Sequence, residues 1–288
     1  MNLDAGQREQ SFRDKFLGLL GNTDHGPIDC SRVMAVFAHP DDETIAMGGQ
    51  LARLSGIRLL HVTDGAPACM RDAEANGFSR REDYAAARKR ELAVAVGLAG
   101  VPREALLTPA VPDQTAAFRM PVLAHLLAAT FSVRRTTLVI THAYEGGHPD
   151  HDATALAVHA ACRMLEERNM PPPDILECPL YHAYHGDWVL QDFTPLPEAD
   201  TPALVIKLGN EVAQVKRQMF HAHATQRRTL ADFAFETERF RPAPCYDFSQ
   251  LPNGGELLYE WYDWGLDGET WLRLAEEARR ELELPRWF

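Results

Sequence analysis

The sequence predicts a Rossmann-like α/β fold, in which helices cover both faces of a mostly parallel sheet. Short apolar runs alternate with stretches of helical periodicity along most of the 288 residues. Strands that alternate with helices favour a parallel sheet, because each helix carries the chain back to the edge where the next strand begins. The chain is 45% hydrophobic and 24% charged, which is enough for a sizeable buried core.

The predicted strands are short apolar runs bounded by charged or turn residues. They cover residues 33–38, 59–63, 137–141, 175–177 and 204–207. The predicted helices cover residues 43–54, 80–98, 152–168, 211–223 and 268–283. The second of these helices has a start signal, since Ser79 and Glu82 have the spacing of a capping box. In such a sheet we expect ligands to bind beyond the carboxyl ends of the strands.

The chain divides into three predicted parts. Residues 1–30 form an N-terminal arm, 31–240 form the main domain, and 241–288 form an aromatic-rich extension that packs on the same domain. The tryptophans of the extension, Trp261, Trp264 and Trp271, are compatible with a sugar-stacking wall or with packing against the core. The second interpretation is favoured, because aromatic clusters of this kind more often pack a tail onto a core.

Charge and composition exclude several classes of protein. The net charge is −12 and no Lys/Arg run stands out, which argues against a nucleic-acid groove or a polybasic membrane patch. The polar start MNLDAGQREQ lacks a secretory core, and no run approaches the roughly 18 apolar residues of a membrane span. Five cysteines without a Cys-x-x-Cys pair argue against a disulfide framework. We therefore expect a cytoplasmic protein.

Two segments rich in histidine and aspartate stand where an α/β sheet would place a site. Residues 38–43 (AHPDDE) directly follow the first predicted strand, and residues 148–151 (HPDH) lie in the loop after the third. Histidine and aspartate are good zinc ligands, and a catalytic zinc takes three protein ligands and leaves one position for water. We expect His39, Asp42 and His151 to supply these three ligands.

The remaining polar residues of the two segments suit catalytic roles. Asp41 stands beside a ligand but stays free to accept a proton, as a general base must. His148 is placed to stabilise an oxyanion or to protonate a leaving amine. Asp150 is placed to orient a histidine ligand. His142, just after the third strand, either supports the site or simply ends the strand.

Other interpretations of the same residues remain open at this point. With twelve histidines in the chain, one His–Asp cluster can arise by chance, but two clusters at strand ends are harder to explain in that way. Two histidines and a carboxylate also form the facial triad of non-haem iron oxygenases, although those sites usually lie in β-barrels. A pure binding protein would have no need of an unligated base such as Asp41.

AHPDDE followed by HPDH resembles the PIG-L/LmbE family of zinc-dependent N-acetyl deacetylases, and the resemblance covers roughly residues 31–240. It extends to further family features. These are Thr63-Asp64-Gly65 after the second strand, the Arg-x-x-Glu helix with Arg88 and Glu91, Asp113 in VPDQ, and Glu145-Gly146-Gly147 before HPDH.

This resemblance implies the same zinc ligands as above, with Asp41 as base and His148 as the electrostatic or acid partner. It implies that Arg88 and Asp113 bind substrate, although Arg88 is also compatible with an i,i+3 surface pair with Glu91. The implied reaction removes an acetyl group from the nitrogen of an amino sugar or a sugar-containing metabolite.

Partners beyond that small molecule are not identified by the sequence. An amidase acting on a thiol–sugar conjugate is the alternative within the family, and a homo-oligomer is left open.

Overall fold

The computed structural model describes residues 11–24, 26–195, 202–262 and 264–285. Among them, seven strands form the main sheet, in the order β12-β13-β9-β8-β2-β4-β6. Their bounds are β2 Val33–Phe37, β4 Arg58–His61, β6 Leu106–Leu107, β8 Leu138–His142, β9 Asp174–Cys178, β12 Leu204–Lys207 and β13 Thr237–Pro242. The pairs from β9 through β8, β2 and β4 to β6 are parallel, and β13 runs antiparallel to both of its neighbours. The predicted α/β class with a mostly parallel sheet is confirmed.

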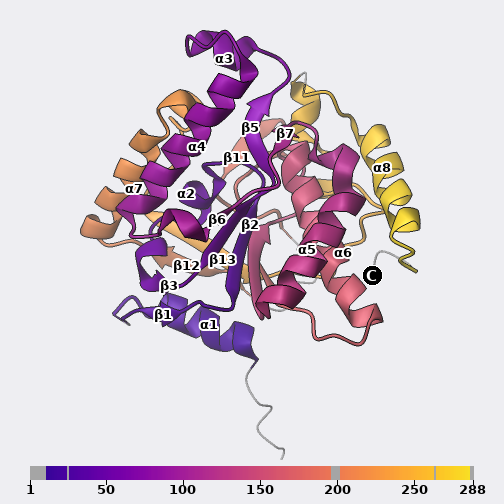
Figure 1. The fold of residues 1–288 in the computed structure, drawn as a ribbon, viewed down its shortest axis with the longest axis horizontal. Coiled ribbons are helices and arrows are strands. Elements are labelled where there is room, and N and C mark those ends of the chain that lie inside the picture. Colours follow the sequence, from indigo (N-terminus) through magenta and orange to yellow (C-terminus); the bar gives the residue numbers. More distant parts are fainter. Residues whose placement is uncertain (1–10, 25, 196–201, 263, 286–288) are drawn as a thin grey trace, which may run out of the picture.

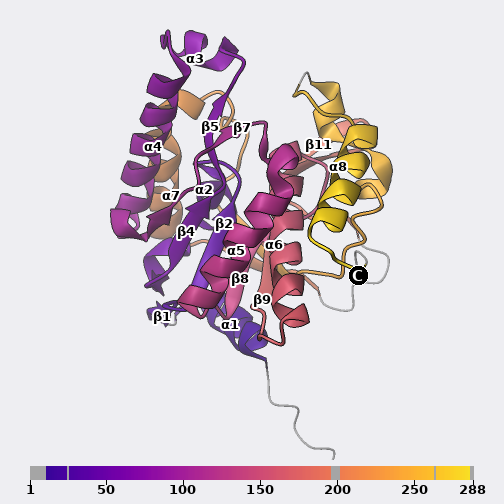
Figure 2. The same ribbon diagram turned by 45° about the vertical axis from the view of Figure 1, so that its right-hand side comes forward.

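Helices cover both faces of this sheet, so the molecule has three layers (Figures 1 and 2). On one face lie α2, α4 and α7, with α1 near the lower edge, and on the other lie α5, α6 and α8. Their bounds are α1 Phe12–Gly21, α2 Asp42–Met47, α4 Arg81–Leu98, α5 Met120–Arg134, α6 Pro149–Glu167, α7 Asn210–Ala222 and α8 Gly268–Glu281.

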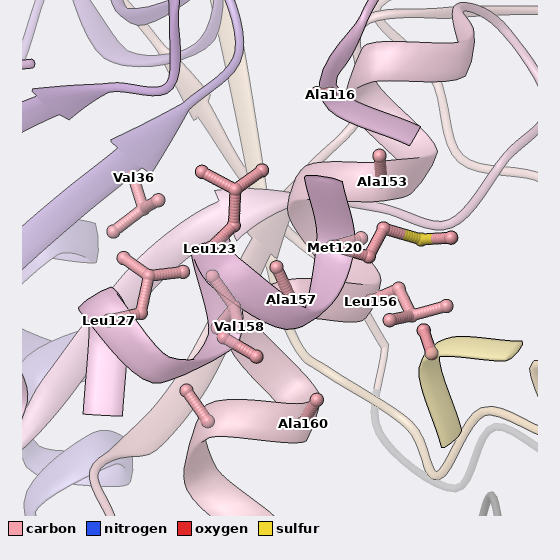
Figure 3. Close-up of a cluster of buried hydrophobic side chains, with 14 of the residues drawn as sticks. Val36, Ala116, Met120, Leu123, Leu127, Ala153, Leu156, Ala157, Val158 and Ala160 are labelled. Atoms are coloured by element: carbon pink, nitrogen blue, oxygen red, sulfur yellow. The ribbon is translucent and has the colours of Figure 1, made fainter. Parts of the chain in front are cut away.

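Strand β2 is buried along its whole length and separates two hydrophobic clusters. Met34 and Val36 pack with α5 and α6, whereas Ala35 and Phe37 belong to the cluster on the opposite face. Figure 3 shows Val36 beside Leu123 of α5. Because successive side chains of a strand point to opposite faces, a continuous apolar run is what a strand between two helical layers requires.

Smaller elements surround the sheet. These are β1 Ile28–Asp29 paired with β3 Leu54–Ser55, β5 Thr63–Pro67 paired with β7 Val111–Asp113, the hairpin β10 Tyr181–Tyr184 with β11 Asp187–Leu190, and the short helix α3 Arg71–Ala75. The β5–β7 pair and α3 extend the structure at one end of the sheet, as Figure 1 shows. That end lies beyond the carboxyl ends of the parallel strands.

One expectation about an individual helix is corrected. The N-cap of α4 is Arg80, with no side-chain capping bond, so Ser79 does not form the predicted capping box. Among the described residues, one helical stretch, Ala116–Arg134, is long and apolar enough to cross a membrane, judged by length and composition alone. In the fold, 44% of its most apolar 18 residues are buried. Arg119 and His125 interrupt the apolar run in the sequence, but the helical stretch continues through both.

Among the residues that the structure describes, no boundary separates the three predicted parts of the chain. Residues 1–10 and 25 of the predicted arm, and 263 and 286–288 of the extension, lie outside the described residues. Trp271 of α8 is fully buried, and its indole N–H donates to the Tyr144 hydroxyl (2.8 Å). Trp271 thus packs against the core, as the favoured interpretation expects, whereas Trp261 of the same extension is 42% exposed.

Candidate metal centre

The two predicted segments meet at the carboxyl edge of the sheet. His39 and Asp42 follow β2, while His148 caps the N-terminus of α6 and His151 lies in its first turn. All four side chains are buried. Residues more than a hundred positions apart in the sequence therefore come together because β2 and β8 are neighbours in the parallel sheet.

Three side chains bring potential metal-ligand atoms close to one another. His39 Nδ1 lies 3.1 Å from His151 Nε2 and 3.4 Å from Asp42 Oδ2, and His151 Nε2 lies 3.4 Å from Asp42 Oδ1. In a tetrahedral zinc site with ligands at about 2.0–2.1 Å, neighbouring ligand atoms are about 3.3–3.4 Å apart. The spacing of these donors thus fits the three ligands that the sequence predicts.

Carboxylates on its far side hold His39 in the orientation that a ligand needs. His39 Nε2 lies 3.1 Å from Asp113 Oδ1 and 3.4 Å from Asp150 Oδ2. If Nε2 carries the proton toward these carboxylates, Nδ1 keeps its lone pair for a cation. Burial by itself lowers the pKa of His39, but Asp113 and Asp42 outweigh it and raise that pKa well above its usual value. The surroundings of His39 therefore favour positive charge.

His142 offers an alternative ligand but is already engaged. Its Nε2 lies 3.4 Å from Asp42 Oδ2, and Asp42, His142 and His151 form one group of potential ligands in the described part of the chain. However, the backbone N–H of Ala38 donates to His142 Nε2 (2.8 Å), and its ring stacks on His151 with centroids 4.1 Å apart. His142 therefore supports the ligands from behind, so of its two predicted roles the structure favours the first.

Asp41 is bound to Arg88 and lies beside the three converging donors. Arg88 Nη2 lies 2.9 Å from Asp41 Oδ2, and the same guanidinium donates to the carbonyls of Gly65 and Pro40. Burial raises the pKa of Asp41 to about 7, although Arg88 lowers it. A carboxylate with a pKa near neutrality is well matched to the role of a general base.

Arg88 does not form the surface pair that was considered for it. It is only 4% exposed, and Glu91 instead accepts hydrogen bonds from the backbone and hydroxyl of Thr225. The side chain lines the cavity, but its donors are directed at Asp41 and at the loop carbonyls. Its geometry is that of a residue that positions the base, and direct contact with substrate stays a prediction.

His148 and Asp150 are oriented by the helix on which they lie. The backbone N–H of Asp150 donates to His148 Nδ1 (3.1 Å), so the remaining ring nitrogen, Nε2, carries the proton in the neutral form. Burial, together with His39 and His151, lowers the pKa of His148 well below its usual value. Asp150 accepts from the backbone of Gln114 (2.6 Å) and Ala116 (2.9 Å) and reaches His39, as predicted for an orienting residue.

A cavity opens beside these groups. Among its lining residues are the predicted site residues His39, Asp41, Asp42, Arg88, Asp113 and His148. Asp113, predicted to bind substrate, contacts His39 and lies 3.8 Å from Arg88 Nη1. Tyr181, Phe233 and Trp264 also line the cavity, and no spacing signal in the sequence singles out the first two.

Behind the site, Glu43 holds the first turn of α2. Its Oε2 lies 3.0 Å from His61 Nε2, and its Oε1 accepts from the Thr44 hydroxyl (2.6 Å). His223 of the segment after α7 contacts the same hydroxyl (3.2 Å). The last residue of AHPDDE is therefore structural, and it fixes the helix that begins with Asp42.

The fold and the site together define an α/β protein with a buried His/Asp centre suited to a metal ion. Residues 34–162 match the family model for PIG-L, described as GlcNAc-PI de-N-acetylase. This segment contains both motifs and is less than half of the chain, and over it the chain is similar to the PIG-L (LmbE-like) family.

Curated relatives match a similar part of the chain. "Probable N-acetyl-alpha-D-glucosaminyl L-malate deacetylase 2" of Bacillus cereus is 30% identical over 143 residues, which cover 48% of this chain and 64% of the relative. The Bacillus anthracis protein of the same name is 31% identical, over 48% of this chain and 62% of the relative. The chain thus spans less than two thirds of these relatives.

Solved structures share the fold. A teicoplanin deacetylase in a zinc-inhibited form has a TM-score of 0.54 at 17% identity, covering 75% of this chain and all of its own. N,N'-diacetylchitobiose deacetylase from Pyrococcus horikoshii has a TM-score of 0.50 at 18% identity, covering 84% of this chain and 94% of its own. At these identities the likeness concerns the α/β architecture.

Proposed function

We propose that this chain is a zinc-dependent hydrolase that removes the acetyl group from the nitrogen of an amino sugar. The observation that carries the proposal is the convergence of His39 Nδ1, Asp42 and His151 Nε2 at ligand spacing, with the unligated carboxylate of Asp41 beside them. The names of the family model and of the curated relatives, which specify deacetylases of N-acetylglucosamine-containing molecules, support the choice of reaction and substrate class.

The donor set fits a divalent cation. Asp41, Asp42, Asp113 and Asp150 are buried together, and Arg88 is the guanidinium that faces Asp41 and Asp113. Buried negative charge is costly unless it is compensated, and a cation held by His39, Asp42 and His151 would compensate it. Two nitrogen ligands and one carboxylate also form a ligand set known for catalytic zinc.

Bound zinc would polarise the acetyl carbonyl and lower the pKa of a water molecule. The protein's own residues then manage the protons and the developing charge. Asp41 accepts the proton of the attacking water, and Arg88 holds its carboxylate in place. His148 presents its Nε2 proton to the oxyanion, since its Nδ1 is occupied by the α6 backbone. The proton that Asp41 has accepted then passes to the amine nitrogen as the C–N bond breaks, so that the amine and acetate leave.

The first experiment measures metal content and acetate release on the same preparation, using a panel of N-acetylated amino sugars. We expect bound zinc, acetate release that chelation abolishes, and recovery when zinc is restored. Asp41→Asn should retain zinc and lose at least about a hundredfold in kcat, because a positioned general base contributes about 10²–10⁴-fold. Asp29→Asn is the matched control and should behave as wild type. Asp29 is a surface carboxylate in β1, and it accepts a hydrogen bond from the backbone N–H of Ser31.

Each other outcome removes a specific part of the proposal. Failure to bind zinc would refute the ligand assignment, and stoichiometric iron would favour the oxygenase interpretation instead. Zinc without acetate release from any substrate would refute the acetyl-sugar assignment, and the panel would then extend to amides of thiol–sugar conjugates. Full activity of Asp41→Asn would remove Asp41 from the role of base.

A further inference from the structure

Four aromatic side chains form a continuous surface from the metal centre to the outside of the protein. Tyr181 and Trp188 come from the β10–β11 hairpin, and Tyr262 and Trp264 come from the segment before α8. We refer to these four residues as the aromatic wall. All of them lie outside the segment that matches the family model, residues 34–162.

The rings of the aromatic wall contact one another in sequence. Trp264 and Tyr262 stack with centroids 4.9 Å apart, Tyr262 meets Trp188 edge-on at 5.9 Å, and Trp188 stacks on Tyr181 at 5.6 Å. The Trp188 indole N–H also donates to the Tyr262 hydroxyl (3.2 Å). This hydrogen bond joins the hairpin half of the wall to the C-terminal half.

Both inner members of the wall touch histidines of the candidate site. The Trp264 ring lies 4.8 Å from that of His148, and the Tyr181 ring lies 5.1 Å from that of His151. Both also line the cavity. The outer members, Trp188 and Tyr262, are each 43% exposed. A molecule held in the cavity would contact Tyr181 and Trp264, and a group that leaves the cavity past these two rings would meet Trp188 and Tyr262.

Hydrogen bonds fix the two halves of the wall to each other and to the active-site loop. The Glu256 carboxylate accepts from the backbone of His185 (2.9 Å) and Gly186 (2.8 Å) at the hairpin turn. The Leu258 N–H donates to the carbonyl of Gly146 (2.8 Å), in the loop that precedes His148. The wall is thus held in place before any ligand binds, which reduces the entropy lost on binding.

We propose that the aromatic wall is a second substrate subsite, which stacks on the flat apolar face of a ring attached to the N-acetylated sugar. The inference rests on the proposed deacetylase function and specifies its substrate as a glycoside rather than a free amino sugar. Large exposed aromatic faces next to a polar site bind apolar faces of ligands, and both the C–H face of a pyranose and an aryl ring present such a face.

The test compares three substrates that differ only in the group attached to N-acetylglucosamine. Methyl N-acetyl-β-glucosaminide has no second ring, N,N'-diacetylchitobiose has a pyranose, and phenyl N-acetyl-β-glucosaminide has an aryl ring. They are assayed with the zinc-loaded full chain, with Trp188→Ala and with Tyr262→Ala. Trp261→Ala is the matched control, because Trp261 is 42% exposed and makes no ring contact with the wall among the described residues.

We expect wild type to have a lower KM for at least one ring-bearing substrate than for the methyl glycoside. Trp188→Ala and Tyr262→Ala should each raise the KM for the preferred ring-bearing substrate about tenfold, without a change in its kcat. The kinetic constants for the methyl glycoside should stay the same in both variants, and Trp261→Ala should match wild type on all three substrates. Trp188→Phe should recover most of the affinity, because it keeps a stacking face. A preference for chitobiose or for the phenyl glycoside identifies the kind of ring that the wall accepts.

Equal KM values for the three substrates in wild type, or a ring preference that survives both alanine variants, would overturn the proposal. Binding of the same three compounds, followed by calorimetry, separates this result from failure of the proposed function. Ring-dependent binding that the wall variants abolish, without acetate release, would support the subsite and refute the deacetylase assignment. If none of the three compounds binds, the subsite is refuted.

Discussion

At the scale of single residues, the ion pair of Asp41 and Arg88 decides what the centre can do. Asp41 is buried, and burial raises its pKa to about 7 although Arg88 acts in the opposite direction. Arg88 uses its planar guanidinium to contact Asp41 and the carbonyls of Gly65 and Pro40 at the same time. A lysine has the same charge but cannot reproduce this fork of donors.

Arg88→Lys should therefore lower kcat about a hundredfold, because a base displaced by about 1 Å can cost that much. Zinc content should not change, since Arg88 contacts none of the three ligand side chains. Rates and metal content are measured on the same samples. Arg81→Lys is the control, because Arg81 also pairs with an aspartate, Asp64 at 2.7 Å, but nearer the surface. Equal losses in the two variants would argue against a positioning role for Arg88.

The residues of the metal centre could be predicted because short motifs of histidine and aspartate indicate metal ligands. The sequence predicted that His39, Asp42 and His151 would meet, and the structure brings their donor atoms within 3.4 Å of one another. It did not identify Tyr181 as part of the site, because an aromatic residue in a strand has no signature that distinguishes pocket from core. The burial of Arg88 was likewise invisible, since it depends on where α4 packs.

At the scale of elements, the loop of Glu145, Gly146 and Gly147 links the centre to the hairpin. A Cβ on Gly147 would lie 1.9 Å from the carbonyl oxygen of Tyr181, and Gly146 has a φ of +74°. Glu145 accepts from the backbone N–H groups of Leu180 (2.8 Å) and Tyr181 (3.2 Å). Gly147 is there because the hairpin lies directly against this loop, whereas Gly146 supplies a left-handed backbone conformation beside Leu257.

Gly147→Ala should displace the start of β10 and destabilise the protein by about 1–3 kcal/mol, the usual cost of overpacking. Gly97→Ala is the control, because a Cβ at Gly97 meets no described atom within 4 Å. Since Gly97 lies in helix α4, alanine there should increase the free energy of unfolding, by up to about 1 kcal/mol. Chemical denaturation measures the free energy of unfolding of both variants. If Gly147→Ala were as stable as wild type, the close approach of Gly147 to the Tyr181 carbonyl would be contradicted.

Apolar runs in the sequence marked some strands and missed others. β2 and β8 lie within a residue of their expected positions, because a continuous apolar run marks a strand that is covered on both faces. The edge strand β12 also has its expected bounds, since its apolar run LVI stands out although Val205 is exposed. β13, with the sequence TERFRP, was missed because its buried positions include the charged Glu238 and Arg241 and because it ends in proline. The β10–β11 hairpin was missed as well, since its place is set by contacts with the loop and with Glu256.

At the scale of the whole molecule, buried histidines make stability depend on pH. His159 of α6 is packed between the rings of Tyr246 and Phe248, and burial lowers its pKa from 6.5 to about 4. Between these two values the unfolded chain binds a proton that the folded chain does not bind. The free energy of unfolding therefore falls as the pH falls through this window.

For His159 alone, the loss between pH 6.5 and pH 5 should be about 1.5 kcal/mol. His159→Gln cannot take up this proton, so the difference in unfolding free energy between variant and wild type should change by that amount, in favour of the variant at pH 5. Urea denaturation at the two pH values gives the four free energies that are needed. A difference that does not depend on pH would show that His159 has an ordinary pKa in the folded protein.

The position of the aromatic wall outside residues 34–162 has an evolutionary consequence. The residues proposed for bond breaking all lie within one contiguous stretch of the chain, whereas the proposed recognition surface comes from two later stretches. Mutations of the outer rings, Trp188 and Tyr262, can therefore be sampled by selection while Tyr181 and Trp264 keep their contacts with the histidines of the site. We expect lineages of this protein to diverge in the glycosides they accept sooner than in the reaction they perform.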